Sequence, residues 1–181
     1  ITIDSPRMVV KDEHFFVDKQ RVRIWGVNNS FGANLPSHRD AERLAARIGA
    51  AGINSVRFHH MDTSSFPRGI RDQKEPLKLS GEGLDRLDYF VDQLAKNGVY
   101  ANINLHVGRA ASRILKLPDP LTDYDKIVGI FTPELIEAQK QYARDLLGRV
   151  NKYRNRKYTE DPAVAFVEIT NEDSLFMWSA V

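Results

Sequence analysis

The chain has 181 residues, with 26 lysines and arginines against 24 aspartates and glutamates, and it contains no cysteine. That length suits one domain with a sizeable core. A net charge of +2 spread along the chain argues against nucleic-acid binding, and zero cysteine excludes disulfides and thiolate metal sites. No stretch approaches the roughly 18 consecutive apolar residues of a transmembrane helix, so we expect no membrane contact.

Short apolar runs separated by polar turns open the chain. Residues 8–10 and 15–17 are apolar, the charged residues 11–13 lie between them, and residues 18–20 form a second polar turn. This pattern predicts a small β-hairpin appendage over residues 1–21. Residues 22–181 form a second unit with a different pattern.

In this second unit, strands are expected to alternate with helices. Apolar runs predict four strands, over residues 22–27, 53–59, 99–106 and 163–170. Amphipathic stripes predict three helices, over residues 40–51, 84–94 and 132–150. Gly52 and Asn97-Gly98 mark helix ends, and Thr132-Pro133 supplies a cap followed by a first-turn proline. This alternation predicts βαβ units and a parallel sheet.

The predicted strands carry polar residues on one face and apolar residues on the other. The polar sets are Ser55, Arg57 and His59, then Asn102, Asn104 and His106, then Glu168, Thr170 and Glu172. Strands of a doubly wound sheet are covered on both faces and are apolar throughout. A polar face instead indicates a shared interior, so we predict an α/β fold, the (β/α)8 TIM barrel, with its first four strands and three helices in this chain. An open sheet with one solvated face is the alternative.

Reactive side chains gather where the predicted strands end. The densest segments are residues 56–62, residues 104–106 and residues 168–173. Barrel enzymes place their chemistry at the carboxyl ends of the strands. A carboxylate beside an amide, a guanidinium and imidazoles can act as a general acid or base.

These motifs resemble the first half of a clan A glycoside hydrolase, closest to family 5 and its cellulase-like relatives. The resemblance rests on Trp25-Gly26-Val27-Asn28, residues 52–57, residues 102–106 and Asn171-Glu172, and it extends from about Arg21 to the end of the chain. It implies a retaining hydrolase of β-linked oligo- or polysaccharides, with carbohydrate as its partner and with neither a cofactor nor a metal.

The resemblance also implies a role for individual residues. Glu172 would be the general acid/base, and Asn171 would bind the sugar hydroxyl next to the anomeric carbon. Arg57 would orient the carboxylate of the nucleophile, and His106 would line the subsite of cleavage. We expect the acid to be buried near apolar groups, which keep its proton bound nearer neutral pH. Further candidates for substrate binding are His59, His60, Asn28 and Asn104.

The chain departs from the family pattern by its length. A retaining glycosidase needs two carboxylates about 5–5.5 Å apart, and the resemblance implies that the second is a Glu at the end of strand seven. A complete barrel typically has about 250 residues, but this chain stops nine residues after Glu172, at Val181. We therefore expect a fragment, inactive alone, whose partner is the remainder of its own barrel, strands 5–8. It begins with Ile1, and we expect a secreted or periplasmic protein whose signal lies outside this chain.

Two other functions stay open at this point. One is a non-catalytic carbohydrate-binding relative that lacks a working nucleophile. The other is a metal-dependent hydrolase, although adjacent histidines on a strand point to opposite sides and chelate poorly. Its candidate ligands are His59, His60, Asp62, His106 and Glu172. We further predict a structural ion pair for Glu168 and a solvated basic helix end over residues 149–157. The long loops 60–82 and 107–131 are functional candidates.

Overall fold

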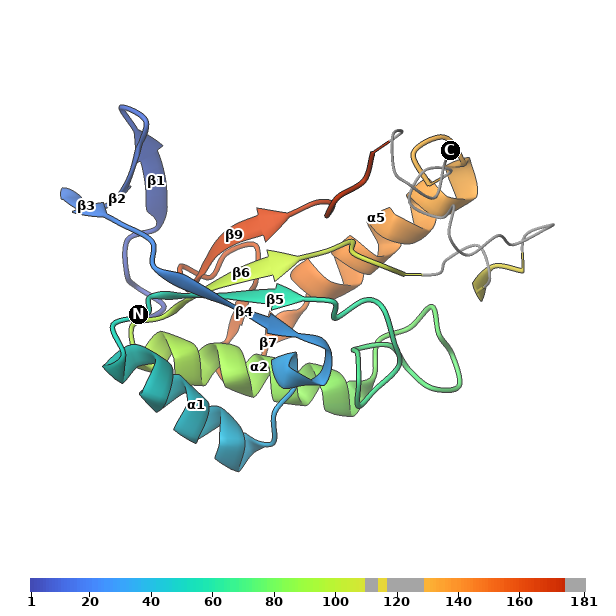
Figure 1. Ribbon diagram of the computed structural model, residues 1–181, viewed down its shortest axis with the longest axis horizontal. Coiled ribbons are helices and arrows are strands. Elements are labelled where there is room, and N and C mark those ends of the chain that lie inside the picture. The colour runs from blue at the N-terminus through green and yellow to red at the C-terminus, as the bar shows by residue number, and fades with distance from the viewer. Residues whose placement is uncertain (110–113, 117–128, 175–181) are drawn as a thin grey trace.

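In the part of the chain that the structure describes, four parallel strands and three α-helices make up the main unit (Figure 1). The computed structural model describes residues 1–109, 114–116 and 129–174. Within these residues the sheet follows chain order, as β4 (Gly26–Ser30), β5 (Ser55–His59), β6 (Tyr100–Asn104) and β9 (Val164–Glu168). A strand order without reversal is that of a barrel, whereas a doubly wound sheet reverses at a switch point.

The helices begin and end at the signals that the sequence carries. Ser37 caps α1 (His38–Ala50) and Ser80 caps α2 (Gly81–Lys96), each accepting a main-chain N–H three residues later. Gly52 and Gly98, just beyond these helices, have φ of 75°, a conformation that costs glycine little. At α5 (Pro133–Leu147), Thr132 occupies the cap position and Pro133 the first turn, as predicted.

The apolar face of the sheet packs against the helices and forms the core. Val56, Phe58 and Ile103 are fully buried, and the rings of Phe58 and Phe90 meet edge to face at 5.7 Å. Helices α1 and α2 lie side by side along this face (Figure 1). Four of the polar residues predicted to share the opposite face meet there through hydrogen bonds, because side chains along a strand alternate at period two: Arg57, Asn102, Asn104 and Glu168.

A register shift places the polar layers of β6 and β9 opposite each other. Ala101 pairs with Val164, but Asn102 already pairs with Phe166, so β9 carries one extra residue there. Such a bulge re-aims the side chains beyond it. As a result Asn104 lies opposite Glu168, near the carboxyl ends of both strands.

The segment predicted as a hairpin is a three-stranded antiparallel sheet. It contains β1 (Met8–Lys11), β2 (His14–Val17) and β3 (Gln20–Val22), and the third strand falls partly within the range assigned to the first barrel strand. A tight turn at Asp18, with φ of 54°, reverses the chain so that Gln20 pairs with Val17. The barrel strand therefore begins later than expected, at Gly26.

This N-terminal sheet contacts the middle of β9. The rings of Phe15 and Phe166 pack edge to face with centroids 5.2 Å apart. Phe166 shares its strand face with Glu168, so Phe15 packs on the same face of β9 as the polar residues. The division of the chain into an appendage, 1–21, and a barrel half stays a prediction.

The sequence predicts a solvated basic helix end over residues 149–157. In the structure, two arginines of this run instead form ion pairs with buried aspartates. Arg149 donates two hydrogen bonds of 2.5 Å to the carboxylate of Asp88, which is fully buried in α2. Arg154 donates to both oxygens of Asp161, at 2.5 and 2.8 Å. A short hairpin of β7 (Val150–Asn151) and β8 (Arg156–Lys157) places these arginines.

The structure describes the whole of the predicted loop 60–82, whereas the predicted loop 107–131 lies largely outside the described residues. In the described part of the chain, no helix is long and apolar enough to cross a membrane.

Candidate active site at the carboxyl ends of the strands

Glu168, at the end of β9, is the centre of a hydrogen-bonded polar cluster. Arg57 on β5 donates to both of its oxygens, Nε at 2.8 Å and Nη2 at 2.6 Å. Asn102 and Asn104 on β6 each donate to one oxygen, at 2.6 and 2.5 Å. The ion pair predicted for Glu168 is thereby confirmed, and its partner is Arg57.

Four donors hold Glu168 in its charged form. The hydrogen bonds from Arg57 are the largest influence, and together with those from Asn102 and Asn104 they overcome partial burial and lower the pKa of Glu168 to about 2. The pKa of Arg57 is raised in turn, mainly by its hydrogen bond to Glu168, and the charge of Glu172 contributes. Both side chains remain about one-third exposed, at 28% and 30%, so the pair faces the open end of the sheet.

Asn171 joins this cluster to the end of β6. Nη2 of Arg57 donates to Oδ1 of Asn171 at 2.8 Å. The main-chain N–H of Asn171 donates to the carbonyl oxygen of His106, also at 2.8 Å. Three of the predicted site residues, Arg57, Asn171 and His106, are therefore connected directly in the structure.

Glu172 directly follows Asn171 and is exposed. The expected burial near apolar groups is therefore not seen among the described residues. Its main chain is left-handed, with φ of 55°. Phe31 and His60, just past the ends of β4 and β5, are also left-handed, with φ of 53° and 58°. Strained residues of this kind concentrate at functional sites, and here they lie at the carboxyl ends of three parallel strands.

His106 is buried between two carboxylates. Its Nδ1 lies 3.7 Å from Asp62, and its Nε2 lies 3.8 Å from Asp173. Both distances are too long for hydrogen bonds. The ring is only 7% exposed, so its orientation is set by packing and by the two charges.

His59 and His60 do not point to opposite sides, which corrects the sequence prediction. Strand β5 ends at His59, and the left-handed main chain of His60 turns its ring back, so that the two rings meet edge to face at 4.2 Å. His60 also stacks on Phe31 at 4.4 Å. Burial is the main cause that lowers the pKa of His59, and the charge of Arg57 adds to it.

The two asparagines predicted to bind substrate have different surroundings. Asn104 is fully buried and donates to Glu168, so its amide N–H group serves the polar cluster. Asn28 is exposed on β4 and lies in register with Arg57. In the described part of the chain, no group of three or more His, Asp or Glu side chains is arranged to hold a metal ion.

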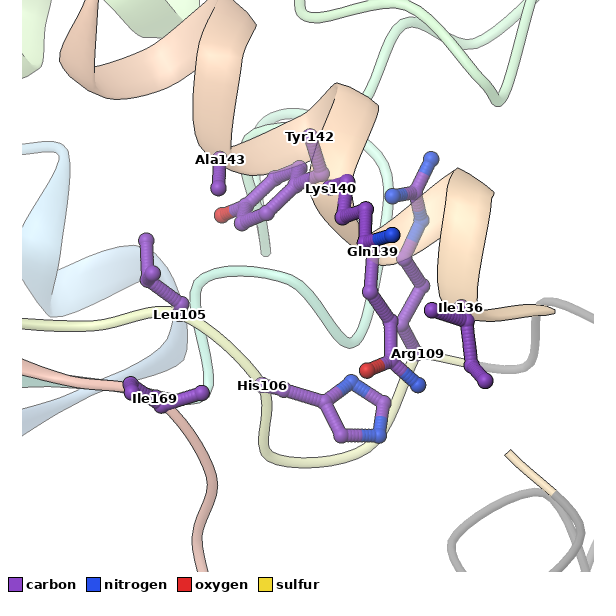
Figure 2. A pocket seen from close by; sticks show the side chains of 9 residues that line it. All are labelled: Leu105, His106, Arg109, Ile136, Gln139, Lys140, Tyr142, Ala143 and Ile169. Carbon is purple, nitrogen blue, oxygen red and sulfur yellow. The ribbon is translucent and has the colours of Figure 1, made fainter. Parts of the chain in front are cut away.

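A cavity of about 260 Å³ lies beside the polar cluster, between α5 and the ends of β6 and β9. Figure 2 shows Ile136, Gln139 and Tyr142 reaching from α5 toward the segments that carry His106 and Ile169. Its lining is mostly apolar, and burial raises the pKa of Tyr142. The imidazole of His106 is the group that this cavity shares with the candidate site.

The sequence pointed to Asp62 only as a ligand of the alternative metal-dependent hydrolase, and not as a residue of the glycosidase site. Asp62 is fully buried in the loop after β5, and its carboxylate reaches the end of β6. The signal in the sequence was an aspartate three residues beyond a strand end, within the run 56–62.

No protein-family model matches this chain, and no curated protein matches it. Solved structures do. An endo-1,4-β-mannanase from Rhizomucor miehei has a TM-score of 0.74 at 18% identity, covering 92% of this chain and 48% of that protein. A family 5 mannosidase from the same organism has a TM-score of 0.74 at 18% identity, covering 93% and 49%. An endo-β-1,4-mannanase from Thermotoga petrophila has a TM-score of 0.63 at 20% identity, covering 86% and 36%.

Likeness at this level of identity establishes the fold. The chain spans about half or less of the length of these three proteins. Its architecture is part of a (β/α)8 TIM barrel, so the predicted fold class is confirmed, and the predicted resemblance to family 5 is confirmed at the level of the fold.

Proposed function

We propose that this chain is the first half of a retaining glycoside hydrolase that acts on β-linked oligo- or polysaccharides. Glu172 is the general acid/base, which protonates the leaving oxygen and then activates water. Asn171 binds the hydroxyl next to the anomeric carbon, and His106 lines the subsite of cleavage. The structural neighbours are mannanases and a mannosidase, so a β-mannan is the first substrate to try.

The observation that carries this proposal is the bonded chain from Arg57 through Asn171 to His106, beside Glu172. Nη2 of Arg57 donates to the side chain of Asn171, and the main-chain N–H of Asn171 donates to the carbonyl oxygen of His106. Arg57 lies on β5, and His106 and Asn171 follow the carboxyl ends of β6 and β9. Barrel enzymes hold their active sites at this end of the strands. The hydrogen bonds fix Asn171, while the carboxylate of the next residue, Glu172, stays exposed. An exposed carboxylate on a fixed main chain suits a general acid, because the acid must reach the leaving oxygen of the substrate.

The nucleophile of this proposal lies outside the chain. Glu168 is the other carboxylate of the cluster, but each of its oxygens already accepts two hydrogen bonds. Donors that lower its pKa to about 2 also lower its nucleophilicity. Glu168 therefore holds Arg57 in place, and the remaining strands of the barrel, 5–8, supply the attacking carboxylate. A polysaccharide substrate fits the further proposal that the protein is secreted or periplasmic.

The test compares the full-length protein with the isolated 181-residue chain on β-mannan, β-glucan and xylan. We expect the full-length protein to hydrolyse one of them and the isolated chain to hydrolyse none. NMR of the first product should show retention of the anomeric configuration, as a two-step mechanism requires.

Other outcomes would point to the alternatives. Binding of a polysaccharide without hydrolysis by the full-length protein would favour the non-catalytic carbohydrate-binding relative. Loss of hydrolysis on addition of a chelator would favour the metal-dependent hydrolase. Inversion of configuration would contradict the retaining mechanism.

A further inference from the structure

Asp62 is a fully buried carboxylate in the loop after β5. Its Oδ2 accepts three successive main-chain N–H groups, from Val107 at 2.9 Å, Gly108 at 3.1 Å and Arg109 at 3.1 Å. Consecutive amides that converge on one oxygen form an anion-binding nest. The side chain of Asp62 therefore fixes the main chain that directly follows His106.

The same oxygen also faces the imidazole of His106. Oδ2 lies 3.7 Å from Nδ1 of His106, and Asp173 lies on the other side, 3.8 Å from Nε2. A ring held between two negative charges has a preferred orientation even without a short hydrogen bond. His106 extends from there into the cavity beside α5 (Figure 2).

The effect of Asp62 reaches the end of β9 through the main chain. The carbonyl oxygen of His106 accepts the N–H of Asn171 at 2.8 Å, and Glu172 is the next residue. A shift of the His106 main chain would therefore move the peptide that carries the proposed acid.

We infer that Asp62 is a positioning residue, whose carboxylate sets the orientation of His106 and, through the His106 carbonyl, the placement of Asn171 and Glu172. This inference rests on the proposed function for its effect on catalysis. Its effect on His106 does not depend on any activity.

If Asp62 had a purely structural role, replacing it would have different effects. Asp62 also interacts electrostatically with Arg71 and Arg109, both of which are largely desolvated. If balancing these charges were its whole role, replacing it would destabilise the fold and leave the His106 ring and the turnover of folded molecules unchanged. A useful control is Asp161, an equally buried carboxylate that binds Arg154 and the N–H of Ala163.

The experiment uses the full-length protein with the substitutions D62N and D161N. The ¹H–¹⁵N signals of the His106 ring, assigned by their loss in H106Q, are recorded by NMR, and kcat and KM are measured on a natural β-linked oligosaccharide, whose leaving oxygen needs a proton. For D62N we expect displaced His106 signals and a kcat lowered by about 10- to 100-fold with little change in KM. For D161N we expect a lower melting temperature with the His106 signals and kcat of the parent protein.

His106 signals in D62N that coincide with those of the parent protein would overturn the inference, whatever the activity. If D62N does not fold, D62E keeps the charge and moves the carboxylate, and unchanged His106 signals there would overturn it equally. Displaced signals in a protein that hydrolyses no glycoside would support the positioning of His106 and contradict the proposed function, so the two failures are distinguishable.

Discussion

Two arginine–carboxylate pairs of the same design lie in different regions of the molecule. Arg154, between β7 and β8, and Asp161, just before β9, are 4% and 0% exposed. Arg57 and Glu168, at the carboxyl ends of β5 and β9, are 28% and 30% exposed. Both pairs are bidentate, but only Arg57 has a further donor directed to a neighbouring strand end, at Asn171. Burial makes the first pair a part of the fold, whereas partial exposure leaves the second pair available to organise a site.

The largest expected effect comes from breaking the buried pair. D161N removes the closer of the two carboxylates that face the buried Arg154 guanidinium and leaves only Asp92, at 3.9 Å. We therefore expect a loss near the lower end of about 3–5 kcal/mol in the free energy of unfolding. The turnover of the molecules that remain folded should not change. Urea denaturation and kcat measured on the full-length protein check both expectations, and a kcat that falls with stability would contradict the division between the two regions.

At the exposed pair, R57K should have the opposite effect to D161N, with a large loss of activity and a small loss of stability. Lysine keeps the charge but lacks the planar fork that binds Glu168 and Asn171 together. We expect activity to fall by about 100-fold, because the neighbour of Glu172 is no longer fixed, with a smaller loss of stability than in D161N. R154K is the matched control, and it should be the less stable and the more active of the two variants.

E168Q tests the pH dependence of the exposed pair. The pKa of Glu168 is about 2 in the folded protein, below its ordinary value of about 4.3 in an unfolded chain. The stabilisation it provides is therefore present above the unfolded pKa and is lost as the pH falls toward 2. We expect E168Q to be less stable than the parent by about 1–2 kcal/mol at pH 7, discounted for solvent exposure. That difference should shrink between pH 4 and pH 2 in urea titrations, and a constant difference would contradict the ion pair.

The smallest effect is expected at a third arginine–carboxylate pair, on the surface of α2. Arg86 binds Glu82 one turn away at 2.6 Å, and Glu82 is 59% exposed. E82Q should change the free energy of unfolding by less than about 0.5 kcal/mol, because solvent screens an exposed pair. A loss as large as that in E168Q would show that burial does not rank these pairs.

The local pattern of the sequence predicted the fold well. Alternation at period two placed Arg57, Asn104 and Glu168 on one face of the sheet, and this face is where they meet. Capping residues and glycines located the helix ends to within a few residues. Strand faces and helix ends depend on residues close together in the sequence, so a single sequence is sufficient to predict them.

Features that depend on distant residues were missed. Asp62 binds amides 45 residues later in the chain, and Arg149 binds an aspartate 61 residues earlier. No local pattern records such pairs. The contact of His59 with His60 depends on a left-handed main chain, which the residue type His does not indicate. The polar turn at residues 18–20 was predicted, but Val22 was assigned to the first barrel strand, so the third strand of the N-terminal sheet was missed.

The most direct test of the central claim, that Glu172 is the general acid, is a leaving-group series with E172A in the full-length protein. Natural glycosides need a proton on the leaving oxygen, so we expect hydrolysis to fall by about 10²- to 10⁴-fold. Aryl glycosides with good leaving groups need little proton help, and their first step should stay near the rate of the parent protein. E160A, at an exposed glutamate away from the strand ends, should behave like the parent. Parent-like rates of E172A on both kinds of substrate would contradict the assignment of Glu172.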